Sequence, residues 1–157
     1  MESKTLEDAI DDIMLAIETT LKAEINIDGG ILSDVKTLVI GEATSQKPTT
    51  PALWINQGLS RLSKTDENYL ITEYWNTEII VISVIYNTDQ RQGFKDANSL
   101  AARAKRVLLT DRTLGFGHGT FFSDIRSESF EGSNPQYKRG NIFSSIYTCK
   151  AYYTVYE

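Results

Sequence analysis

The chain has 157 residues, of which 41% are hydrophobic and 24% charged, so we predict one globular domain over residues 1–157 and exclude a disordered chain. Its net charge of −5 argues against a dedicated nucleic-acid binder, which would show a basic surface. The single cysteine, Cys149, permits no internal disulfide, which fits synthesis in a reducing cytoplasm, and no apolar run approaches the roughly 20 residues that cross a bilayer.

The first predicted element is an amphipathic helix over residues 6–25. Thr5 followed by Asp8 resembles a capping box at the start of this helix. The helix is expected to end before Gly29 and Gly30, because glycine disfavours helix. We interpret the acidic residues of its polar side as a solvated surface, not as a cation site. The apolar stripe that should face the core comprises Leu6, Ala9, Ile10, Ile13, Met14, Ile17 and Leu21.

Two strands are predicted next, over residues 35–43 and 52–57. The polar segment between them contains Lys47, Pro48 and Pro51, and we expect it to be an exposed loop that contacts a partner. Shortening such a loop should leave the melting temperature within a few degrees, because closure entropy changes slowly with loop length.

Residues 68–87 are predicted to form a long strand. The stretch 79–86 is apolar at seven of eight positions, which is typical of a central strand buried on both faces. The earlier half is mixed and aromatic, and a strand of this length is expected to overhang the core and to need another surface to lie on.

Three aromatic residues on these strands are the candidate interface residues. Tyr74 and Trp75 are neighbours, so they point to opposite faces of the pleat, and we expect one of them to lie at an interface together with Trp54. The charged residues expected to form a polar rim around them are Glu73, Glu78 and Arg91. The alternative is that both Tyr74 and Trp75 pack inside the domain under the C-terminal hairpin.

A second amphipathic helix is predicted over residues 88–111, followed by "LGFGHGT" at 114–120, which contains the only histidine, His118. A phosphate-binding loop follows a strand and precedes a helix, whereas this stretch follows a helix and precedes a strand. We therefore interpret it as a turn with Gly115 as the helix cap. Pairing of His118 with Cys149 as base and nucleophile is formally possible, but we expect both residues to be dispensable.

Residues 121–131 and 141–156 are predicted to form an antiparallel hairpin that ends in tyrosines. Together these elements predict an α+β fold in which a central, mostly antiparallel sheet of about five strands is flanked by two main helices.

This organisation resembles the tail terminator (tail completion) proteins of long-tailed bacteriophages. The features that carry the resemblance are the acidic opening helix, the loop "SQKPTTP" before "ALWINQG", and the long strand "EYWNTEIIVISVIYN" before the helix "DANSLAARAKRVLL". The "LGFG" turn before a tyrosine-ended hairpin completes them, so the likeness spans nearly the whole chain.

The resemblance implies a structural virion protein that forms a hexameric ring at the head-proximal end of the tail. Such a ring stops polymerisation of the tail tube protein and docks the head completion or connector protein, and DNA passes through its lumen without specific binding. It implies assembly in the host cytoplasm and no catalysis, cofactor, metal or membrane.

The residues leave other functions open. The nearest is another neck or head–tail joining protein. The others are a small cytoplasmic hydrolase that uses His118 and Cys149 or the helix carboxylates, and a cytoplasmic binding module with a ferredoxin-like sheet.

Overall fold

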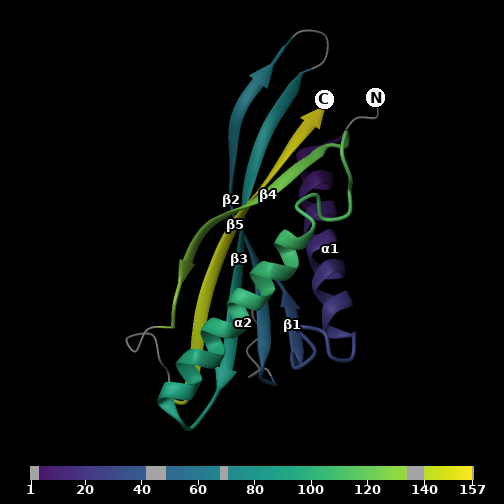
Figure 1. Ribbon diagram of the computed structural model, residues 1–157. Helices are drawn as coiled ribbons and strands as arrows, with labels where there is room; N and C mark the ends of the chain where they lie inside the picture. Colours follow the sequence, from purple (N-terminus) through teal and green to yellow (C-terminus); the bar gives the residue numbers. More distant parts are fainter. Residues whose placement is uncertain (1–3, 42–48, 68–70, 134–139, 157) are drawn as a thin grey trace.

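A computed structural model describes residues 4–41, 49–67, 71–133 and 140–156 of the chain. The elements in chain order are α1 (Leu6–Ile25), β1 (Thr37–Ile40), β2 (Ala52–Asp66), β3 (Thr72–Tyr86), α2 (Gln90–Thr110), β4 (Phe122–Glu131) and β5 (Ile142–Tyr156). The five strands form one sheet in the order β1-β2-β3-β5-β4, in which only the pair β1–β2 is parallel (Figure 1). The predicted α+β class and mostly antiparallel five-stranded sheet are confirmed.

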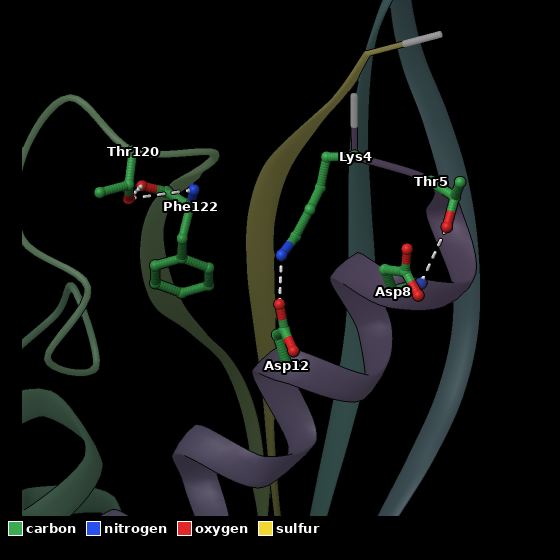
Figure 2. Close-up of polar contacts among 6 residues, drawn as sticks. All are labelled: Lys4, Thr5, Asp8, Asp12, Thr120 and Phe122. Carbon is green, nitrogen blue, oxygen red and sulfur yellow. Dashed lines mark hydrogen bonds and ion pairs between the residues drawn. The ribbon is translucent and has the colours of Figure 1, made fainter. Parts of the chain in front are cut away.

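Both helices begin at side-chain caps. The Asp8 backbone N–H donates to the Thr5 hydroxyl at 3.1 Å, as the capping motif predicts (Figure 2). Helix α1 ends at Ile25, ahead of the two glycines. At the start of α2 the Gln92 backbone N–H donates to the Asp89 carboxylate at 3.1 Å. Each cap satisfies a backbone donor that the first turn of a helix leaves unpaired.

Helix α2 lies very close to the sheet, and small residues make this possible. Ala97, Ala101 and Ala104 are fully buried. At Gly93 an added Cβ would come within 2.3 Å of the Phe143 ring on β5, so only glycine fits there. These contacts fix α2 against the middle of the sheet.

The hydrophobic core lies between the two helices and one face of the sheet. Ile79 and Val81 of β3 and Tyr147 of β5 lie on this face, in the same buried cluster as the apolar stripes of α1 and α2. Ile80 and Ile82 alternate with them, point to the opposite face and are only half-buried. The prediction that 79–86 is buried on both faces is therefore wrong at Ile80 and Ile82, because both helices pack on the other side, and it is confirmed on the outer face only at Val84, which is 4% exposed.

Strands β2 and β3 form a hairpin that extends past the ends of both helices (Figure 1). The overhang predicted for the long strand is confirmed. The prediction that the preceding strand ends at Gln57 is wrong, because β2 continues to Asp66. Residues 58–66 are mostly polar and largely solvent-exposed, so they lack the apolar alternation by which a strand is recognised. We call residues 58–66 and 71–74 the arm.

The "LGFGHGT" stretch is a turn, as predicted, and Gly115, Gly117 and Gly119 adopt φ values of +82°, +77° and +78°. The predicted cap is corrected. Helix α2 ends at Thr110, and Asp111, not Gly115, is its C-cap. The Thr113 hydroxyl and the backbone N–H groups of Thr113 and Gly115 donate to the Asp111 carboxylate and lower its pKa. One carboxylate therefore orders the whole entry to the turn.

Candidate functional site

The two residues with catalytic potential lie in very different surroundings. Cys149 is fully buried in β5, with its Sγ 3.8 Å from the Ile79 carbonyl oxygen, and burial raises the pKa of its thiol to about 12. His118 is exposed on the turn. A protonated thiol inside the core is not available to attack a substrate, because the thiolate is the nucleophile.

Metal sites and membrane-spanning helices are both absent from the described part of the chain. No group of three or more His, Cys, Asp or Glu side chains there could hold a metal ion. Neither α1 nor α2 is long and apolar enough to cross a bilayer. The surfaces that remain to be considered are those for contact with other proteins.

The strongest candidate is the face of the sheet that the helices leave uncovered, which we call the outer sheet face. Trp54 of β2 lies on this face, in register with Val39 on one side and Ile82 on the other. Ile82 is in turn paired with Ile146 of β5, so apolar side chains form one row across four strands. All of them are half-buried. Trp54 was predicted from the sequence to be an interface residue, whereas the row that surrounds it was not.

Trp54 carries an unusual polar group for this position. Its indole Nε1–H is buried and has no acceptor among the residues that the structure describes. A buried donor without a partner costs about 1–3 kcal/mol of stability, so it is rare in folded proteins.

The predicted aromatic pair on β3 is divided between the two faces, as the pleat requires. Tyr74 lies on the outer face, 39% exposed, with the Lys64 ammonium 5.7 Å from its ring centroid. Trp75 packs against the core, and its Nε1 donates to the Glu73 carboxylate at 3.4 Å. Of the two neighbours, Tyr74 is therefore the one available to a partner.

The predicted polar rim is only partly assembled. Glu78 is in register with Lys150 on the outer face, whereas Glu73 bonds to Trp75 on the helix side. Arg91 is exposed on the first turn of α2, beyond the opposite end of β3 from Tyr74. The distance along β3 from Tyr74 to Tyr86 is about 40 Å, at about 3.3 Å per residue. The expectation that Arg91 borders Tyr74 is therefore wrong, because it ignored the length of the strand between them.

The loop residues are less informative. Pro51 directly precedes β2, and its carbonyl accepts from the Lys36 backbone N–H at 2.8 Å. Lys47 and Pro48 lie outside the described residues, so their role in an exposed contact loop stays a prediction.

Two groups of exposed apolar residues were missed from the sequence. Leu59, Leu62 and Ile71 on the arm are 53%, 47% and 51% exposed. Leu15 on α1 is 61% exposed, and it borders an open groove of about 510 Å³ between α1 and the turn after α2. The signal for Leu15 was present in the sequence, because it is a leucine outside the apolar stripe of the helix.

No protein-family model and no curated protein matches the chain. A solved structure does: a chain in the virion of a native gene transfer agent (GTA) particle, with a TM-score of 0.53 and 9% sequence identity. The match covers 92% of this chain and 94% of that one. At this identity the likeness establishes the fold: this chain is similar, over nearly its whole length, to a protein of that virion.

Proposed function

We propose that the chain is a structural virion protein, and specifically a tail terminator that forms a ring of six copies. The observation that carries the assignment to a virion is the structural match, because it spans 92% of this chain and 94% of a chain from a gene transfer agent particle. The terminator role and the ring rest on the resemblance in the order of elements. The order of helices and strands predicted from the sequence also resembles that of a structural virion protein. A match that includes both helices and the hairpins is more informative than one limited to a common sheet motif.

The surfaces of the fold support assembly with other proteins. A single copy leaves the row around Trp54 only half-buried and exposes leucine and isoleucine side chains on the arm. Partly buried aromatic residues are frequent anchors of interfaces, where their truncation costs about 2 kcal/mol or more. A ring of copies would cover part of these surfaces, and the tail tube protein and the head connector would cover the rest.

The overall charge supports the passage of DNA. With a net charge of −5 the chain would not hold the phosphate backbone, so DNA in the lumen of an acidic ring would remain free to move. The proposed role requires no catalytic group, and the buried thiol of Cys149 is consistent with packing alone.

The proposal is tested by deletion of the gene from the particle that encodes it, with electron microscopy of the products. Loss of a terminator should give headless tail tubes of irregular, excessive length, because nothing stops polymerisation. Restoration of the wild-type gene is the control. Tails of normal length that fail to join heads would instead assign the chain to another part of the neck. Complete, infectious or transfer-competent particles would contradict both roles.

A further inference from the structure

The groove beside α1 combines an apolar floor with an acidic rim. Its floor is formed by Ala16 of α1 and by Leu114 and Phe116 of the turn, and the exposed Leu15 stands at its edge. Two carboxylates, Asp12 and Asp111, line it from opposite sides. The groove therefore suits a segment that brings both apolar surface and positive charge.

The charge of the rim continues along α1. Asp8 lies one turn before Asp12 on the same side of the helix and is exposed without an ion-pair partner among the described residues (Figure 2). Asp12 forms an ion pair with Lys4, whose ammonium also lies 4.3 Å from the Phe121 ring centroid. Helix α1 as a whole has six carboxylates and one lysine, a net charge of −5.

Helix α2 has the complementary character. It carries five cationic side chains and one carboxylate, a net charge of +4. Arg91, Lys95 and Arg106 follow one another along its outward stripe with the small Ala102 between them. None of these three cations pairs with a carboxylate in the described part of the chain, and all three are exposed. The two helices of one acidic chain thus present opposite charges to solvent.

We infer that the outward stripe of α2 docks into the groove beside α1 of a second copy of the chain. This inference rests on the proposed ring, since it names the surfaces through which neighbouring copies meet. The aliphatic stems of Arg91 and Lys95 cover the apolar floor while their charged ends reach the acidic rim. Each copy offers one stripe and one groove, so the contact can repeat from copy to copy.

Charge reversal on each of the two surfaces tests whether the stripe meets the groove. A stripe variant, Arg91→Glu with Lys95→Glu, makes the α2 stripe acidic. A rim variant, Asp8→Lys with Thr19→Lys, makes the edge of the groove basic at two exposed positions. A control variant, Asp28→Lys with Ser33→Lys, introduces the same change in charge as the rim variant at exposed positions outside the groove.

The readout is the mass of the assembly by light scattering, with circular dichroism to verify folding. Each reversed variant should be folded and should assemble at least tenfold more weakly than wild type. An equimolar mixture of the two should assemble again, because each acidic stripe meets a basic rim and each basic stripe meets an acidic rim. The control should assemble as wild type does.

Three outcomes would overturn the inference. If both variants assemble as wild type does, copies meet through other surfaces, and the proposed ring is unaffected. If the mixture of variants does not regain assembly, the stripe does not meet the groove. If the variants assemble normally but no longer bind the tail tube, the groove belongs to that partner. Failure of the wild-type chain to assemble under any condition would count against the ring itself.

Discussion

At the scale of single residues, the contrast between Tyr74 and Trp75 shows what the pleat of a strand decides. The sequence could predict that these neighbours face opposite sides, because alternation is a property of any strand. It could not predict which of them meets the core, since that depends on which face the helices cover. The structure assigns Trp75 to the core and Tyr74 to the outer face.

This assignment predicts that one substitution has a large effect on stability at Trp75 and a small one at Tyr74. Trp75→Glu should lower the free energy of unfolding by about 2 kcal/mol or more, because it removes packing and places a carboxylate against the core. Tyr74→Glu should change the free energy of unfolding by less than about 1 kcal/mol, because the side chain at this position is already exposed to solvent. Urea unfolding of both variants, with Trp75→Phe as the conservative control, measures the difference. Equal destabilisation at the two sites would refute the assignment.

Three buried groups, Cys149, Tyr147 and Tyr153, make stability sensitive to alkaline pH, because burial raises the pKa of each. Burial raises the pKa of the Cys149 thiol from 9.0 to about 12 and that of the Tyr147 hydroxyl from 10.0 to about 12, the latter opposed by its hydrogen bond to Ser127. Above pH 9 the unfolded chain releases protons that the folded chain retains. The free energy of unfolding should therefore fall as pH rises, by up to about 1.4 kcal/mol per pH unit for each group.

Urea unfolding between pH 8 and 11 tests this expectation. Cys149→Ala should remove the part of the decline that begins near pH 9. Tyr147→Phe should reduce the part that begins near pH 10, to which Tyr153 also contributes because burial raises the pKa of its hydroxyl. At pH 8 the native thiol should resist a thiol reagent and react only after unfolding. A pH dependence identical in wild type and both variants would show that these groups do not carry it.

At the scale of elements, the sequence predicted best where one side of an element is buried. Helix α1 was predicted with its observed bounds, and strand β5 to within a residue, because both alternate clearly between apolar and polar positions. The second half of β2 was missed because residues 58–66 have little core to face. The C-cap of α2 was predicted at Gly115, four residues after the observed cap, Asp111. Glycine is the usual cap residue, whereas here the Asp111 carboxylate accepts the hydrogen bonds that end the helix.

The arm is expected to contribute to assembly more than to folding. Leu59→Ser with Ile71→Ser should lower the free energy of unfolding by less than about 1 kcal/mol, because both side chains are about half exposed. The same variant should assemble at least tenfold more weakly, by sedimentation, if the arm reaches a neighbour. Leu53→Ser on the same strand is the buried control and should cost about 3 kcal/mol or more. If the arm variant assembles as wild type does, the arm makes no contact that stabilises the assembly.

At the scale of the whole molecule, the candidate site was only partly accessible from the sequence. Trp54 was predicted from the sequence as an interface residue, but Ile82 beside it and Ile146 beside Ile82 are distant in sequence and join the same row only through the strand order. The uncovered face is likewise a consequence of topology, because both helices pack on the same side of the sheet (Figure 1). A single chain also carries no record of its partners, so contacts across copies must be inferred from what one copy leaves exposed.

The central claim is that copies of this chain form a closed ring of a virion. Native mass spectrometry of the purified wild-type chain, over a range of concentrations and with the tail tube protein added, tests it most directly. We predict one dominant closed species of six copies of the 17.7 kDa chain, alone or on the tube, with little open intermediate. A chain that stays monomeric at every concentration and in the presence of the tube would contradict the claim.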